Sequence, residues 1–305
     1  MRVISLIPSS TEIVCALGYG DSLVGRSHEC DYPRTVQALP ICSSPKINTK
    51  GSSREIDERV KQMVKEALSV YRVDTEMLKK LAPDVIVTQA QCEVCAVSLK
   101  DVEQAVCAWL DAKPRLVTLS PNSLEDIWQG MRDVARALGD PQKGEALAAE
   151  CRERMRCVCE KAGPGSSHPS VVCIEWIAPL MAAGNWMPEL IEMLGGINLF
   201  GTAGEHSPWM SWEALRQKDP DILVIMPCGW DMEKSSQEMK TLVSQPGWGD
   251  LKAVRQARVY LTDGNQFFNR PGPRLVESLE ILAEIMYPHI SLGHEGNGWR
   301  KYTSA

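Results

Sequence analysis

Two short segments carry residue types that could bind a metal or support redox chemistry. Cys92 and Cys95 form a Cys-x-x-Cys pair, and His28 and Cys30 lie in a second polar segment. Thiolates and imidazole nitrogens are ligands of zinc and iron, and a structural zinc site takes four of them. The pair could equally be redox-active, or be two packed and inert thiols. His28 could form a local hydrogen bond, or bind the cobalt or iron of a ligand as a neutral imidazole.

Composition narrows the function classes. The chain has 305 residues and a formal net charge of −6, which argues against the clustered positive charge of a nucleic-acid-binding surface. Its 11 cysteines are dispersed, as is typical of free thiols in a reducing compartment. The apolar run over 3–7 is too short for a signal peptide. We therefore expect a cytoplasmic protein, or an extracytoplasmic one if a leader has been removed.

The elements that must position these residues follow an α/β pattern. Strand-like apolar runs alternate with helical periodicity, which predicts parallel sheets with helices. The expected strands are 3–7, 23–27, 84–89 and 115–120 in the first part, and 171–176, 221–227 and 258–262 in the second. Ser9 and Glu12 match a capping box for a helix from Thr11 to about Leu17, closed by Gly18.

A long helical region separates the two parts. A helix is expected over 123–138, and Asp140 and Pro141 have the residue types of an N-cap and first turn for another that runs to about residue 162. That helix would be roughly 33 Å long and would form a rigid joint. We expect an N-terminal lobe over 1–122, a bridging helical region over 123–165, a C-terminal lobe over 166–290 and a flexible tail over 291–305.

A weak internal repeat predicts that the two lobes are built alike. Glu76 and Glu213 each lie seven residues before a Pro-Asp pair, and the aspartates, Asp84 and Asp221, each open an apolar run. In both places a short helix is expected to lead into a buried strand.

The candidate ligand-binding residues come from the segments that follow the expected strands. Ligands bind beyond the carboxyl ends of parallel strands, so these segments should line one cleft between the lobes. Nine tryptophans against three phenylalanines suit a pocket for a large flat ligand. The candidates are Ser9, Ser10, His28, Glu29, Tyr32, Gln89, Cys92, Glu93, Cys95, Trp176, Trp186, Trp209, Trp230, Phe268, Asn269 and Arg270.

No catalytic residue is expected. The sequence contains no Gly-x-Ser-x-Gly, Walker or Rossmann pattern, and no Ser/His/Asp arrangement stands out.

Several segments resemble a known family. The opening VISLIPSSTEI over 3–13, LAPDVIV over 81–87 and NRPGPR over 269–274 resemble the vitamin B12-binding substrate-binding proteins of ABC importers, which have a helical backbone and belong to class III. The likeness covers about residues 2–290. HECDYP over 28–33, CEVC over 92–95 and CIEW over 173–176 resemble a leaderless branch of that family.

The resemblance implies a fold and a function. It implies two Rossmann-like lobes bridged by one long α-helix, with a ligand cleft between them that holds a corrin by aromatic rings. In the importer proteins one glutamate of each lobe docks onto the permease, and Glu76 and Glu213 match those positions. Glu29 stands where a stacking tyrosine is familiar. We therefore expect a non-enzymatic, monomeric carrier or substrate-binding protein for cobalamin or a related corrinoid or metal chelate, with an ABC-importer permease as its partner.

Two alternatives use the same segments differently. The first is a protein that binds zinc, iron or an iron chelate through His28, Cys30, Cys92 and Cys95. The second is an enzyme that processes a corrinoid through the thiol of Cys92 or Cys95.

Overall fold

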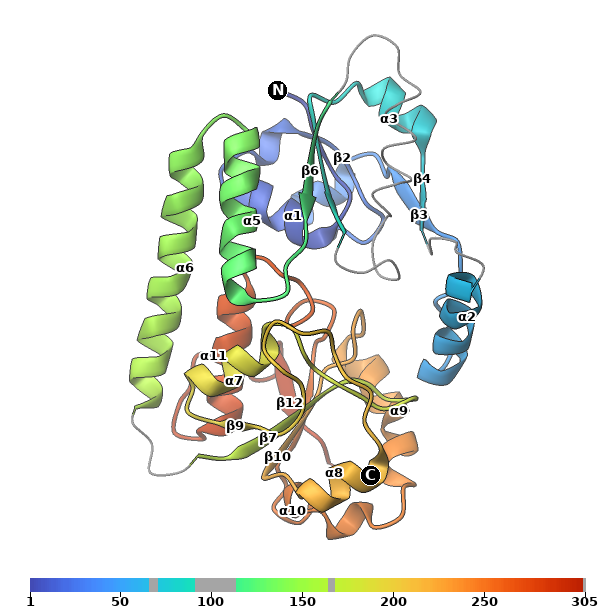
Figure 1. Cartoon of the computed structure of the whole chain (residues 1–305), viewed down its shortest axis with the longest axis vertical. Coiled ribbons are helices and arrows are strands. Elements are labelled where there is room, and N and C mark those ends of the chain that lie inside the picture. Colours follow the sequence, from blue (N-terminus) through green and yellow to red (C-terminus); the bar gives the residue numbers. More distant parts are fainter. Residues whose placement is uncertain (66–70, 91–113, 164–167, 304–305) are drawn as a thin grey trace. The chain divides into compact units, whose positions relative to one another are not determined.

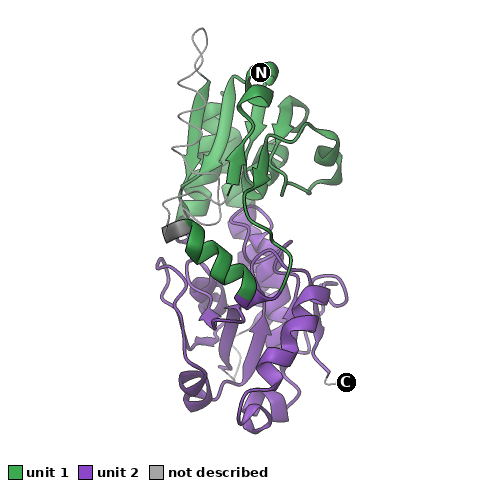
Figure 2. Cartoon of the chain, turned by 90° about the vertical axis from the view of Figure 1, so that its right-hand side faces the viewer, with its two compact units in different colours: residues 1–51, 55–121, 125–150 green, residues 52–54, 122–124, 151–305 purple. Residues whose placement is uncertain are grey.

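The chain forms two compact α/β units. A computed structural model describes residues 1–65, 71–90, 114–163 and 168–303 (Figure 1). Unit 1 comprises residues 1–51, 55–121 and 125–150, and unit 2 comprises residues 52–54, 122–124 and 151–305 (Figure 2). Both units contain parallel sheet and helices, which confirms the predicted fold class.

Unit 1 is built on a four-stranded parallel sheet in the order β2-β1-β5-β6. The two central strands of this sheet are buried along their whole length, β1 and β5 alike. A separate antiparallel pair, β3 with β4, packs through Val73 and Cys42 against the same core as Ile4 and Ile86. The strands are β1 (Val3–Ser5), β2 (Leu23–Arg26), β3 (Ser43–Pro45), β4 (Tyr71–Val73), β5 (Val85–Gln89) and β6 (Arg115–Leu119).

The first helix begins earlier than the sequence predicts. Helix α1 (Pro8–Ala16) has Ile7 as its N-cap, without a side-chain hydrogen bond, so the expected capping box of Ser9 and Glu12 is wrong. Proline is favoured in the first turn because its φ is already helical and it has no N–H to satisfy. Ser9 therefore lies inside the first turn, and Gly18 (φ 81°) follows the helix end as expected.

Unit 1 contains three further helices in the described residues. They are α2 (Ser53–Lys65), of which the first two residues are grouped with unit 2, α3 (Thr75–Leu81) and α5 (Leu124–Ala137). Short 3₁₀ turns cover Gly20–Ser22 and Arg34–Ala38.

Helix α6 (Pro141–Ala162) is shared between the two units near its middle. It starts at Pro141 as predicted and has 22 residues. Residues 141–150 are grouped with unit 1 and residues 151–162 with unit 2. The single bridging helix expected from the sequence is thus present. Among the described residues, no helix is long and apolar enough to cross a membrane.

Unit 2 contains a six-stranded sheet. Its order is β12-β11-β10-β7-β8, with β9 paired to β7, and all neighbours are parallel except the edge strands β8 and β12. The strands are β7 (Ser170–Trp176), β8 (Met181–Ala182), β9 (Ile197–Asn198), β10 (Ile222–Ile225), β11 (Val259–Thr262) and β12 (Trp299–Lys301). The helices are α7 (Met187–Met193), α8 (Trp212–Lys218), α9 (Met232–Val243), α10 (Lys252–Arg255) and α11 (Leu275–Met286), with a 3₁₀ turn at Trp248–Asp250.

The C-terminal segment differs from the expected flexible tail. Strand β12 pairs with β11, and the Trp299 ring is buried and meets the ring of Tyr260 edge-on with centroids 5.5 Å apart. The polar, glycine-rich composition of this segment predicted a loose end. The segment is nevertheless ordered, because Trp299 is buried and β12 pairs with the edge of the sheet at β11.

Candidate functional site

In unit 1, a polar cluster follows the carboxyl end of β2. His28 Nδ1 lies 2.9 Å from Ser43 Oγ, and the imidazole ring lies beside the Tyr71 ring with centroids 5.2 Å apart. The Tyr71 hydroxyl donates a hydrogen bond of 2.7 Å to Glu29 Oε1, which lies 4.0 Å from His28 Nε2. Ser43 also accepts the backbone N–H of His28 at 3.2 Å, so it fixes both the backbone and the ring.

The surroundings of His28 favour its neutral form. Partial burial lowers the pKa of His28, and the nearby positive charge of Arg26 lowers it further. A neutral imidazole that donates from Nδ1 to a hydroxyl carries its lone pair on Nε2, which is the form that binds a metal. His28 is therefore suited to metal ligation at neutral pH.

Cys30 faces the interior of unit 1. Its side chain is 1% exposed, and its sulfur accepts a hydrogen bond of 3.0 Å from the Thr11 hydroxyl. In the described part of the chain, no three His, Cys, Asp or Glu side chains are grouped to hold a metal ion. Cys92, Glu93 and Cys95 lie outside the described residues, so their role stays a prediction.

The other unit 1 candidates have mixed environments. The Ser10 hydroxyl lies 2.6 Å from that of Ser5 and donates to Ile7 O, which is a structural role. The buried Ser9 hydroxyl has no hydrogen-bond partner among the described residues. Gln89 ends β5 and is buried, whereas Tyr32 is 43% exposed.

In unit 2, an aromatic pair lies at the carboxyl ends of adjacent strands. Trp176 ends β7 and Trp230 follows β10, with ring centroids 5.2 Å apart. Lys234 Nζ lies 4.3 Å from the centroid of the Trp230 ring, and burial lowers the pKa of this lysine. Trp176 is only partly buried and its indole N–H donates to Ser53 O at 3.3 Å. The pair thus combines a flat apolar surface with a cation.

Four other candidates of unit 2 support the fold instead of presenting a surface. Phe268 is fully buried, and its carbonyl accepts the indole N–H of the buried Trp186 at 2.8 Å. The Asn269 amide donates to Met226 O and Gly264 O, both at 3.0 Å. Buried Arg270 donates to Asn265 at 3.1 Å. Each follows a strand as predicted. Burial distinguishes Trp186, Phe268 and Arg270 from Trp176, whereas Asn269 is partly buried, as Trp176 is. Trp209 is 56% exposed.

Sequence reasoning missed three residues of these clusters. Ser43 and Tyr71 lie on the two-stranded sheet of β3 and β4, far along the chain from Glu29, and no sequence pattern pairs them. Lys234 lies four residues after Trp230, and its place on α9 is set by the N-cap Asp231. An i, i+4 spacing after a capping residue could have indicated Lys234.

Glu76 and Glu213 occupy matching positions. Each is the second residue of a short helix, α3 or α8, and each is exposed. The Glu76 side chain is 84% exposed and pairs with Lys79 at 3.0 Å.

Comparison with known proteins agrees with this architecture. A model of the family described as periplasmic binding protein matches residues 3–265. The chain is 25% identical over 293 residues to an uncharacterized ABC transporter substrate-binding lipoprotein of Bacillus subtilis, covering 94% of this chain and 80% of the relative. It is 25% identical over 284 residues to the vitamin B12-binding protein of Vibrio vulnificus, covering 93% and 89%.

A solved structure shows the same fold. The periplasmic heme-binding protein RhuT from Roseiflexus sp. RS-1, in its apo form, superposes with a TM-score of 0.70 at 26% identity, covering 94% of this chain and 98% of that one. The resemblance drawn from the sequence motifs is therefore confirmed at the level of the family.

Proposed function

Because the chain belongs to the periplasmic binding protein family, we propose that it is a substrate-binding protein for cobalamin or a related corrinoid. Members of this family bind substrates and are not enzymes, and named relatives include vitamin B12-binding proteins. The proposed partner is the permease of an ABC importer, contacted through Glu76 and Glu213. For this role we propose the second of the two locations considered above, outside the cytoplasm, and cell fractionation tests it.

One observation carries the proposal. Each unit has a pair of rings with centroids 5.2 Å apart. In unit 1, His28 follows the parallel strand β2 and meets Tyr71 of β4; in unit 2, Trp176 ends β7 and Trp230 follows β10. Parallel sheets bind ligands at the carboxyl ends of their strands. Rings offer a flat macrocycle a large apolar contact with little loss of side-chain freedom. We propose each pair, within its own unit, as a candidate contact surface for a flat ligand.

The metal of the ligand has a candidate partner in His28. Its neutral imidazole is held through Nδ1 by Ser43, and Nε2 lies on the side of Glu29. Hydroxocobalamin has an exchangeable axial position, so Nε2 binding to cobalt would shift its visible spectrum. The shift should persist in Glu29→Gln and vanish in His28→Ala.

Heme is the second candidate ligand. It is favoured by the likeness, at 26% identity, to a periplasmic heme-binding protein from Roseiflexus. Heme is also flat and accepts imidazole as an axial ligand. Parallel titrations with cyanocobalamin, hydroxocobalamin and hemin distinguish the two, because the true ligand should bind at least tenfold more tightly.

The central experiment is a calorimetric titration of the intact chain with these three compounds. Trp176→Ala should weaken binding of the true ligand about fivefold, since a lost aromatic contact costs on the order of 1 kcal/mol. Trp212→Ala is the matched control, because Trp212 is partly buried against Trp248 and its N–H bonds Pro246 O. Binding weaker than about millimolar for all three compounds would reject the proposal.

A further inference from the structure

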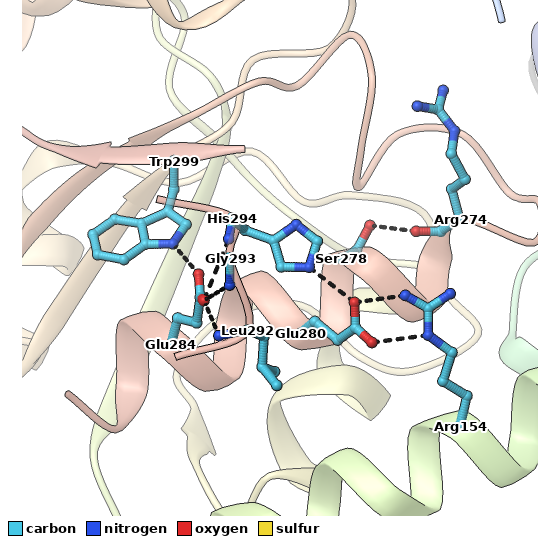
Figure 3. A network of polar contacts seen from close by, with 9 residues as sticks. All are labelled: Arg154, Arg274, Ser278, Glu280, Glu284, Leu292, Gly293, His294 and Trp299. Atoms are coloured by element: carbon cyan, nitrogen blue, oxygen red, sulfur yellow. Dashed lines mark hydrogen bonds and ion pairs between the residues drawn. The ribbon is translucent and has the colours of Figure 1, made fainter. Parts of the chain in front are cut away.

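The C-terminal segment is fastened to unit 2 by a network of charged and buried groups, which we call the C-terminal clasp. It consists of Arg154, Glu280, Glu284, His294 and Trp299 (Figure 3). Arg154 comes from α6, the two glutamates from α11, and His294 and Trp299 from the segment after α11. Three parts of the chain that are distant in sequence thus meet at two carboxylates.

Glu280 joins α6 to the C-terminal segment. Arg154 donates to both of its oxygens, Nε to Oε1 at 2.9 Å and Nη2 to Oε2 at 2.8 Å. His294 Nε2 lies 2.8 Å from Glu280 Oε2. Glu280 is 7% exposed, whereas the Arg154 side chain is 51% exposed, so the carboxylate is shielded from water and the guanidinium only in part. A bidentate arginine pair with a third charge-assisted bond on the same carboxylate is a strong and directional arrangement.

Glu284 holds the backbone of the same segment. One oxygen accepts the N–H groups of Leu292, Gly293 and His294, and the other accepts the Trp299 indole N–H at 2.5 Å. These bonds position His294 over Glu280 and Trp299 at the edge of β11. The ring of Phe267 lies edge-on to His294 with centroids 6.4 Å apart. The histidine is therefore fixed from several sides.

We propose that His294 is the proton-dependent pin of this clasp: when the imidazole is protonated it fastens the segment that leads into β12 to α11, whereas Arg154 joins α6 to the same carboxylate. The proposal is independent of the ligand, since none of the clasp residues belongs to the aromatic pairs. The other titratable or charged groups that act on the pair are Cys151 from α6, Glu277 and Glu284 from α11, and Arg274 at the start of α11.

The pH range in which the clasp is complete follows from the pKa shifts of His294 and Glu280. The hydrogen bond to Glu280 raises the pKa of His294 above 6.5, against the effect of burial. Its stabilisation is full below pH 6.5 and is lost as pH rises through the folded-state value. Burial would raise the pKa of Glu280, but His294 and Arg154 lower it below 4.5. That contribution is full above pH 4.5 and is lost on further acidification.

Hydrogen exchange of the intact chain tests the proposal. Exchange rates corrected for intrinsic chemistry report local opening. Between pH 5.5 and 8.5, protection at 299–301 should fall several-fold relative to 222–225 in β10, because the charge-assisted bond to Glu280 is lost when the imidazole deprotonates. His294→Gln keeps a donor but no charge, so its protection should be low and independent of pH. His168→Gln is the control, because His168 bonds Gly195 O in the same unit.

Two outcomes overturn the proposal. One is an equal pH dependence in wild-type protein and His294→Gln. The other is a His294 midpoint at or below 6.5 in an NMR titration of the wild-type histidines, a measurement that needs no variant to fold. A midpoint above 6.5 that falls in Glu280→Gln supports the clasp.

Discussion

The segment of α3 and β5 in unit 1 and the segment of α8 and β10 in unit 2 are built alike. Both helices start with a side-chain cap. Asp74 accepts the backbone N–H of Met77 in α3, and Ser211 accepts that of Ala214 in α8. Both end at a non-glycine residue with left-handed backbone, Ala82 (φ 42°, ψ 64°) or Asp219 (φ 42°, ψ 66°). The internal repeat in the sequence is thus also a structural repeat.

The aspartates of the repeat share one role but have different surroundings. Asp84 Oδ2 accepts the backbone N–H of Arg2, just before β1, at 2.7 Å. Asp221 Oδ2 accepts the backbone N–H and hydroxyl of Ser170, at the start of β7, at 2.8 and 2.7 Å, and its other oxygen pairs with Lys252. Both tie the entry of one strand to its neighbour. Because Asp221 has additional partners, we expect it to contribute more to stability than Asp84 does.

The largest effect should come from the better-connected aspartate. Burial alone would raise the pKa of Asp221, but Lys252 and Ser170 outweigh it and lower the pKa to about 2. Relative to its ordinary value, this corresponds to roughly 2 kcal/mol of stability at neutral pH. Asp221→Asn should lose about that amount in urea unfolding at pH 7. Asp84→Asn, in the exposed counterpart, should lose only about 0.5–1 kcal/mol.

The pH dependence provides the control for this comparison. A lowered pKa in the folded state gives stability that is complete above the ordinary value of 3.8 and is lost as pH falls through about 2. Wild-type protein and Asp84→Asn should therefore destabilise across this acid range, and Asp221→Asn should do so less steeply. Equal losses for the two variants at pH 7 would show that the unequal surroundings have no energetic consequence.

Apolar runs predicted most of the fold, because a buried strand must be apolar along its length. The run that contains β5 and the run that contains β10 were both located to within about two residues. Contacts between distant segments were not predictable in the same way. Tyr71 reaches Glu29 across 42 residues, and Glu284 holds a segment whose composition indicated a loose end. Such pairs depend on tertiary packing, which cannot be inferred from local composition.

Burial also separated candidates that the sequence treated alike. Trp176 and Phe268 both follow a strand, yet one keeps a partly open ring and the other is fully buried. Position after a strand indicates the correct edge of the sheet but not which side of the backbone a ring occupies. The candidate site could therefore be predicted as a set of segments and not as a set of side chains.

Removing the helix caps should have a smaller effect, about equal in the two units. Asp74→Ala and Ser211→Ala each leave one amide of a short helix without its acceptor, at 2.9 and 3.1 Å in the wild type. Each should cost about 1 kcal/mol in urea unfolding. The exchanged caps, Asp74→Ser and Ser211→Asp, should keep most of the wild-type stability, because serine and aspartate cap helices about equally well. A loss confined to one unit would mean that the two helices do not contribute alike.

Changes at the helix ends should have opposite signs. Ala82→Gly removes the Cβ that strains the left-handed backbone at this position, but it also gives the unfolded chain more freedom. The net effect should be to stabilise the folded protein by about 0.5 kcal/mol. Asp219→Gly relieves the same backbone but removes the bond of 2.7 Å from Lys252 N–H to Asp219 Oδ1. It should therefore destabilise by about 0.5 kcal/mol. Thermal midpoints of both variants against wild type check the signs.

The smallest effect on stability should come from the two glutamates that the repeat places alike. Glu76 and Glu213 are exposed at the second position of α3 and α8, so alanine at either should change unfolding by less than about 0.5 kcal/mol. If they contact the permease, the double variant should keep its ligand affinity and lose at least tenfold in ligand uptake by cells. Glu192→Ala, at an exposed glutamate of α7, should leave uptake unchanged. Normal uptake by the double variant would mean that the repeat serves the fold of each unit and not a docking surface.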